Sequence, residues 1–325
     1  MHRMAIPAVA WLLTVLLLCP AAGGATLHFI AVVDTNDATI GTIDDLSNAV
    51  VWANKIAQYA GLTLNFQSLS GQQLSVAATR QLIDALPVGA DDVVYFFYSG
   101  HGGNPGDRRW PVLYYTTTTN ADNVSMDEVV EALVPKNPRL LIVLADCCNS
   151  YPWQTGRPRA VFQNIAASAQ GIANYQRLFA TFQGSVLSSG CAPGQYSLGA
   201  AGSGGVFVNN FMNALQSLAE TESILTWDQV FRKTAADTAA EAAPELQNPQ
   251  YVITEGQVAG FTPDQLGLDP PGNQTGDGQL TGISGTSGGG LLFPACGALA
   301  ATECMLAAMW IGLVGLRRSI RRPRA

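Results

Sequence analysis

Two reactive side chains, a histidine and a cysteine, each follow a long apolar stretch of this 325-residue chain. His101 comes after VVYFFYSG and precedes Gly102, and Cys148 comes after RLLIVLADC. A thiolate can attack a carbonyl carbon, and an imidazole can protonate the amine that leaves. His101 is one of only three histidines in the chain. We therefore interpret His101 and Cys148 as a pair equipped for acyl transfer.

The glycines beside His101 suit the same chemistry. Without side chains they let a substrate backbone come close and leave amide N–H groups accessible. We expect the backbone N–H groups of Gly102 and Cys148 to hold the oxyanion that acyl transfer creates. The alternative is a plain turn histidine with cysteines as small buried apolar groups. We favour the reactive pair because both residues end successive apolar strands, whereas His28 lies within a strand and is interpreted as a core or face residue.

The elements that must position this pair alternate between strand and helix patterns. The patterns predict strands at 26–34, 62–69, 91–99, 112–116, 139–146 and 179–189, and helices at 44–61, 75–86, 125–134, 204–220 and 226–243. The region 152–177 has no regular pattern. Such alternation is typical of βαβ units and a mostly parallel sheet, whose functional groups gather beyond the carboxyl ends of its strands. His101 and Cys148 are expected at one edge if their strands are neighbours.

Both ends of the chain have sequence features typical of protein export or membrane anchoring. Residues 1–25 combine His2 and Arg3, a short apolar run and small residues, which is typical of a secretory signal peptide. Residues 263–290 form a Gly/Ser/Thr-rich linker, and 291–325 an apolar stretch with an Arg-rich end, interpreted as a transmembrane segment or a sorting tail. We expect an exported protein that is periplasmic, at the cell surface or secreted, anchored to a membrane if the tail is retained.

The charge of the chain between these ends argues against nucleic acid as a partner. Positions 26–290 hold 11 Lys/Arg and 23 Asp/Glu, a net charge of about −12, since Arg3, five tail arginines and Glu303 lie outside. Binding to phosphates relies on clustered cations. The same stretch has three cysteines, Cys147, Cys148 and Cys191, an odd number that does not make a disulfide framework.

The two strand ends resemble those of the caspase and metacaspase family of cysteine peptidases, in which S-G-H-G and D-x-C-H-S-G carry the catalytic dyad. Five segments between about Thr26 and Gly260 are similar to the family: YFFYSGHGG, LADCCNS, SSGCAPGQYS, GSGGVFVNNFMNAL and LQNPQYV. The resemblance implies a caspase-like three-layer α/β/α sandwich with a mostly parallel central sheet over residues 26–262. It makes His101 the catalytic base and Cys148 the nucleophile.

The resemblance also implies peptide-bond cleavage after a chosen side chain, called P1. Metacaspases select arginine or lysine with carboxylates, and Asp45, Ser99 and Asp146 match their substrate-pocket positions. We therefore expect a basic P1 residue, held by paired carboxylates. The alternative role for Asp45 is helix capping. Asn149 and Tyr151 depart from the family's histidine and glycine.

Three functions agree with these residues. The favoured one is an exported cysteine endopeptidase acting on proteins or peptides. The others are a catalytically inactive caspase-like binding or scaffold module, and a legumain-like or gingipain-like peptidase with another P1 residue. We assign no metal or other cofactor; calcium activation would draw on acids such as Asp91 and Asp92, but acids ahead of a strand are commonly solvated, and calcium takes six or more oxygen ligands. The oligomeric state is left open.

Overall fold

The structure, a computed structural model, describes residues 24–106, 108–115, 122–150, 161–243 and 246–267 and the backbone of 283–284. Residues 1–23 of the expected signal peptide, Tyr151, most of the expected linker and the tail from 291 lie outside these residues. Within the described part of the chain, no helix has the length and apolar character needed to cross a membrane.

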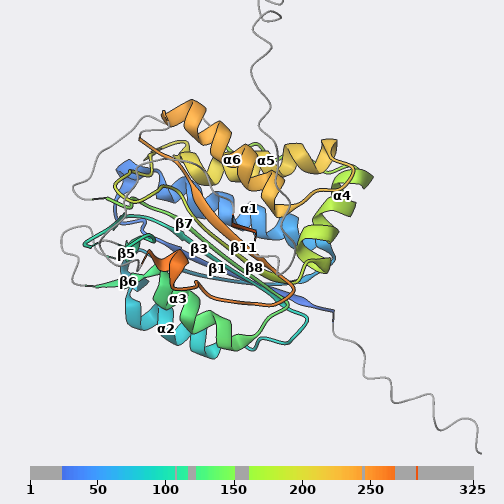
Figure 1. Cartoon of the computed structure of the whole chain (residues 1–325), viewed down its shortest axis with the longest axis horizontal. Coiled ribbons are helices and arrows are strands. Elements are labelled where there is room, and N and C mark those ends of the chain that lie inside the picture. The colour runs from blue at the N-terminus through green and yellow to red at the C-terminus, as the bar shows by residue number, and fades with distance from the viewer. Residues whose placement is uncertain are drawn as a thin grey trace, which may run out of the picture. The chain divides into compact units, whose positions relative to one another are not determined.

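A seven-stranded sheet forms the centre of the fold, in the order β12-β11-β8-β7-β3-β1-β2 (Figure 1). Its strands are β1 (Thr26–Val33), β2 (Thr63–Ser70), β3 (Val93–Ser99), β7 (Leu140–Asp146), β8 (Gly184–Ser189), β11 (Gln250–Glu255) and β12 (Ile283–Ser284). Neighbouring strands run parallel except β8 and β11, which are antiparallel. Two small antiparallel sheets join β4 (Gly102–Gly103), β5 (Val112–Tyr114) and β6 (Asn123–Ser125), and β9 (Gly199–Ala200) with β10 (Gly204–Gly205).

Helices cover both faces of the central sheet (Figure 1). One face carries α1 (Thr42–Ala60), α4 (Ala169–Tyr175), α5 (Val206–Thr221) and α6 (Trp227–Ala242), and the other carries α2 (Val76–Ala85) and α3 (Met126–Leu133). Shorter helical turns are η1 (Ala38–Ile40), η2 (Gly71–Gln73), η3 (Val134–Lys136), η4 (Gln176–Thr181) and η5 (Asp264–Leu266). The predicted three-layer α/β/α sandwich with a mostly parallel sheet is confirmed.

The two hydrophobic cores follow from the alternation of side chains along each strand. In β1, Phe29 belongs to the core under α1 and α5, while Ile30 belongs to the core under α2 and α3. All seven residues of β3 and of β7 are buried. Strands covered on both faces are apolar on both faces, which is why these two segments read as near-continuous hydrophobic runs in the sequence.

The strand predicted at 179–189 is wrong over its first part. Residues 176–181 instead prolong α4 as a wide helical turn, and the region 152–177, which showed no pattern, contains α4 itself. Phe179 is fully buried, with its ring 5.1 Å from that of Trp227. The strand begins at Gly184, whose φ of 140° and close approach to the Thr254 carbonyl exclude a side chain. Aromatic and β-branched composition favoured a strand, but packing against α6 favours the helix.

Candidate active site

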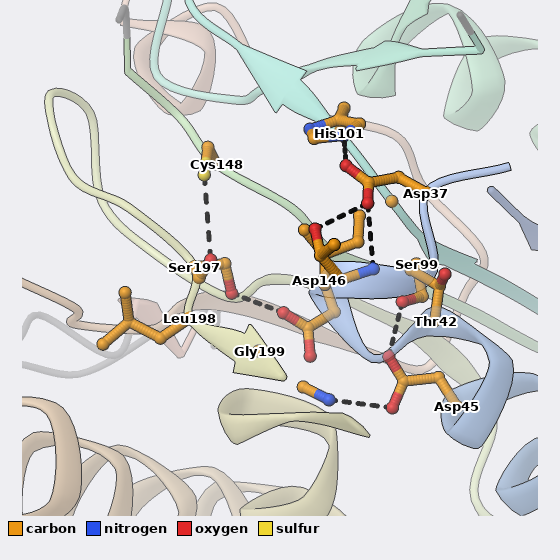
Figure 2. A pocket seen from close by; sticks show the side chains of 14 residues that line it. Asp37, Thr42, Asp45, Ser99, His101, Asp146, Cys148, Ser197, Leu198 and Gly199 are labelled. Carbon is orange, nitrogen blue, oxygen red and sulfur yellow. Dashed lines mark hydrogen bonds and ion pairs between the residues drawn. The ribbon is translucent and has the colours of Figure 1, made fainter. Parts of the chain in front are cut away.

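The predicted reactive pair lies at the edge where β3 and β7 end. These strands are parallel neighbours with Ser99 opposite Asp146, so His101 and Cys148 each follow two residues beyond a matched position. Both residues line one pocket, together with Asp45. Figure 2 shows His101 and Cys148 on the same side of this pocket, with Asp146 and Asp45 below them in the view. The register of two buried strands therefore brings the imidazole and the thiol to one site.

His101 is held through both its backbone and its ring. The Tyr98 hydroxyl donates to the His101 carbonyl at 2.6 Å, which anchors the turn after β3. The ring nitrogen Nε2 lies 3.1 Å from Oδ2 of Asp37, a residue in the loop after β1. The His101 side chain is 15% exposed, so the ring remains accessible from the pocket. These two contacts orient the His101 ring and place the Asp37 carboxylate beside Nε2.

Cys148 is a nearly buried thiol. It is 8% exposed, and Sγ lies 3.7 Å from the Ser197 carbonyl oxygen. Burial raises the pKa of the Cys148 thiol to about 11, because the thiolate loses its hydration. At neutral pH the thiol of the unliganded protein is protonated. Nucleophilic attack therefore requires a neighbouring base to accept the proton.

Gly102, the predicted oxyanion donor, passes close to the cysteine segment. It lies in β4, paired with Leu113 of β5. A Cβ at Gly102 would fall 2.6 Å from Cys147 Sγ and 2.7 Å from the Cys148 carbonyl oxygen. Such distances are below van der Waals contact, so only glycine lets the chain after His101 run this close to Cys148.

Asp45 and Asp146 form a pair of buried carboxylates at the base of the pocket. Ser99 Oγ donates to Asp45 Oδ2 at 2.6 Å, and the Gly205 N–H donates to Asp45 Oδ1 at 2.9 Å. The Val208 N–H, in the first turn of α5, donates to Asp146 Oδ2 at 3.0 Å. None of the ion pairs formed by the described residues includes either carboxylate.

The protonation of this pair is set by burial and by mutual repulsion. Burial, together with the charge of Asp146, raises the pKa of Asp45 to about 7. Burial raises the pKa of Asp146 to about 6, against the hydrogen bonds from Ser197 and Val208. Two buried carboxyl groups that repel each other keep a proton to a higher pH than either group would alone. A cation placed between them would favour the doubly ionised state.

The pocket role of Asp45 can be compared with the helix-capping alternative. The N-cap of α1 is Gly41, and no side chain caps that end of the helix. The Asp45 carboxylate instead bonds to Ser99 and Gly205, which belong to other elements. Capping therefore does not account for Asp45.

Sequence reasoning missed three polar residues of the site: Asp37, Ser197 and Gln247. The Ser197 hydroxyl donates to Asp146 Oδ1. Gln247 is fully buried; its amide donates to Ser197 Oγ at 2.8 Å and accepts from the Leu198 N–H at 3.0 Å. Asp37 follows β1 as His101 follows β3, so the rule about the carboxyl ends of strands could have found it. Ser197 and Gln247 lie in two of the segments that resemble the family, SSGCAPGQYS and LQNPQYV, but no local pattern assigns a role to either residue.

Asn149, which departs from the family motif, has a structural role. It is fully buried, and its amide donates to the Arg109 carbonyl at 2.8 Å and accepts from Asn104 Nδ2 at 3.1 Å. These bonds tie the segment after Cys148 to the loop after His101. Cys147 and Cys191 are free, fully buried thiols.

His28 lies at the other end of its strand, away from the site. It is buried, with Nε2 3.1 Å from Asp92 Oδ2 and Nδ1 3.0 Å from Asn65 Nδ2, as suits the interpretation of a core residue. Asp92, one of the acids considered for calcium, also accepts from the Thr26 and Gly89 N–H groups at 2.7 Å. The described residues contain no cluster of three or more His, Cys, Asp or Glu side chains suited to a metal ion.

Comparison with known proteins gives one family match. The family model Peptidase_C14, described as a caspase domain, matches residues 30–255. No curated protein matches the sequence. Among solved structures, the chain is similar to the crystal structure of protein GSU0716 from Geobacter sulfurreducens, with 16% identity, 74% of this chain and 96% of that chain covered, and a TM-score of 0.42.

Proposed function

Since the chain belongs to the caspase-domain peptidases of family C14, we propose that it is a cysteine endopeptidase that uses His101 and Cys148 and cleaves after arginine or lysine. One observation supports this proposal above others. A histidine and a cysteine from neighbouring strands line the same pocket as two buried carboxylates that have no cationic partner among the described residues.

The proposed reaction begins with a proton transfer from Cys148 to His101. The thiolate then attacks the carbonyl carbon of the scissile bond, and the N–H groups of Gly102 and Cys148 bind the oxygen that becomes negative. The imidazolium protonates the leaving amine, the C–N bond breaks, and an acyl-enzyme remains. Water, deprotonated by His101, attacks this thioester and releases the acid.

The proposed specificity rests on Asp45 and Asp146. The guanidinium of a P1 arginine, bound between the two carboxylates, would interact with both negative charges and form paired hydrogen bonds. The ammonium group of a P1 lysine would supply the same charge from a single nitrogen. Ser99 and Gly205 orient Asp45 through one hydrogen bond to each carboxylate oxygen. Each oxygen has a second lone pair that could accept a hydrogen bond from the substrate. An acidic P1 residue would add a third negative charge and is expected to be excluded.

Hydrolysis of fluorogenic peptides with Arg, Lys, Asp or Asn at P1 tests this proposal. We expect wild type to cleave the Arg and Lys peptides and Cys148→Ala to cleave none. Cleavage after asparagine would point to a legumain-like specificity. No cleavage of any peptide, with or without calcium, would favour the inactive binding module that Asn149 and Tyr151 suggested.

We also propose that residues 1–25 direct export and that residues 291–325 anchor the protein or act as a removable sorting tail. This proposal rests on composition alone, as those residues lie almost wholly outside the described part of the chain. It makes extracytoplasmic proteins or peptides the expected substrates.

A further inference from the structure

We propose that Asp37 is a positioning residue for His101: its carboxylate keeps the imidazole proton on Nε2 and stabilises the imidazolium that forms during the reaction. The inference rests on the proposed function for the identity of that reaction. Asp37 lies outside the two strand-end motifs that contain His101 and Cys148. The carboxylate–imidazole contact itself belongs to the structure and can be measured without a substrate.

The contact arises from the order of strands in the sheet. β1 lies beside β3, so the loop after β1 reaches the turn after β3 that carries His101. Asp37 Oδ2 lies 3.1 Å from His101 Nε2 (Figure 2). The Asp37 side chain is 26% exposed and the His101 side chain 15% exposed. Such partial shielding makes a charge interaction stronger than in a fully solvated surface pair.

The other carboxylate oxygen of Asp37 is held separately. Oδ1 accepts the Thr39 N–H at 2.9 Å and the Thr39 hydroxyl at 2.6 Å, so that Asp37 caps η1. The loop before it is fixed as well, since Asp34 Oδ1 accepts the Asn36 N–H at 3.1 Å and the Thr42 hydroxyl donates to the Asp34 carbonyl at 2.5 Å. The cap therefore uses one oxygen and leaves the second oxygen aimed at His101.

The charge of Asp37 determines which residue donates the hydrogen bond between Asp37 and His101. The hydrogen bond from the Thr39 hydroxyl, with smaller contributions from the Thr39 N–H and from His101, holds the pKa of Asp37 below its usual value. The group is then an ionised carboxylate at neutral pH and can only accept hydrogen bonds. His101 must then donate through Nε2, so Nδ1 of the neutral ring carries the lone pair, which takes the Cys148 proton in the proposed reaction.

Capping of η1 is the simpler role for Asp37, and the variant Asp37→Asn separates the two. Its amide oxygen can still accept from Thr39, which preserves the cap. Its NH₂ group then faces His101 Nε2 as a donor. The imidazole is expected to respond by moving its proton to Nδ1, the wrong nitrogen for exchange with the thiol.

The ¹⁵N shifts of histidine in the full-length protein, recorded where the ring is neutral, report this tautomer directly. We expect His101 to carry its proton on Nε2 in wild type and on Nδ1 in Asp37→Asn. His28, whose partner is Asp92, provides a reference in the same spectrum and should not change. A wild-type His101 protonated on Nδ1, or a tautomer unaltered by Asp37→Asn, would overturn the inference.

Two rates test the consequence for Cys148. In Asp37→Asn we expect kcat for an Arg peptide to fall on the order of 100-fold with little change in KM, the effect of a misplaced proton on a catalytic histidine. Alkylation of Cys148 by iodoacetamide, located by mass spectrometry, should slow in parallel. The matched control Asp84→Asn removes the same charge from an exposed position of α2 and should leave both rates unchanged. Equal rates in wild type and Asp37→Asn would contradict the proposal.

These readouts separate two kinds of failure. If wild type cleaves no peptide, the proposed peptidase function fails, while the tautomer and the alkylation rate still decide the role of Asp37. If wild type cleaves Arg peptides but His101 is protonated on Nδ1, the role of Asp37 fails and the peptidase stands.

Discussion

Burial determines the protonation of the three side chains that carry the proposed chemistry. Cys148 loses acidity because a thiolate in its nearly closed environment is poorly solvated. Asp45 and Asp146 lose acidity for the same reason, and Asp45 also because of its neighbour's charge. Each group therefore needs a partner before it can act. The Cys148 thiol needs a base to take its proton, and the carboxyl pair needs a cation to become fully ionised.

The raised pKa of Asp45 predicts a stability that falls as the pH rises. The pKa of Asp45 is about 7 in the folded protein, above the usual value of 3.8 for an aspartate. Between these values the folded state binds more protons than the unfolded state, so this group's stabilisation is full below pH 4 and is lost on the way to pH 7. Its slope is at most about 1.4 kcal/mol per pH unit.

Urea unfolding at pH 5 and pH 8 measures this effect, with Asp45→Asn as the matched variant. The variant lacks the ionisable group, so the difference in unfolding free energy between variant and wild type should grow in the variant's favour as the pH rises. A difference that is constant across this range would show that Asp45 ionises normally in the folded protein.

At the scale of single elements, β3 and β7 have near-continuous apolar runs because both faces of the sheet are covered. Their polar ends are consequently conspicuous in the sequence. Residues 176–181 show the limit of such reasoning, since their aromatic and apolar side chains suit a strand as well as a helix. Contacts with α6, a distant segment, favour the helix there.

Substitution of Gly102, in the two-residue strand β4, is expected to reduce both stability and activity. In Gly102→Ala, the new methyl group would meet Cys147 Sγ and the Cys148 carbonyl within 2.7 Å. We expect a destabilisation of about 1 to 3 kcal/mol from overpacking and a loss of peptidase activity, because the turn after His101 must move away from Cys148.

Gly106→Ala provides the control, since it lies in the same loop with no atom within 4 Å of the added Cβ. In urea unfolding, the unfolding free energy of Gly106→Ala should lie within about 0.5 kcal/mol of the wild-type value. Its rate of hydrolysis of an Arg peptide should equal that of wild type. If Gly102→Ala behaved like Gly106→Ala, the close approach of β4 to Cys148 would not matter for function.

At the scale of the whole molecule, β1 begins directly after the proposed signal peptide. Thr26 already pairs with Thr63 of β2, and its N–H donates to Asp92 at 2.7 Å. β1 lies between β2 and β3, so removal of its residues would open the sheet beside the site. A signal peptide ending near Ala25 is the longest that leaves β1 whole.

The start of β1 predicts where the mature protein begins if the proposed export occurs. Sequencing of the N-terminus after expression and cell fractionation should place it close to Thr26, in the extracytoplasmic or membrane fraction. Full-length protein with an intact N-terminus in the cytoplasm would refute the export proposal, and a mature end inside β1 would contradict its proposed boundary.

The sequence by itself determined the architecture and the two motif residues, because buried strands, their polar ends and a family's spacing are local patterns. It also indicated Asp45, Ser99 and Asp146, but only through the family resemblance. Only the tertiary structure decided that Asp37 contacts His101, that Ser197 and Gln247 support Asp146, and that Asp45 and Asp146 repel each other. Those contacts join distant segments through strand order and register, which no local run of residues encodes.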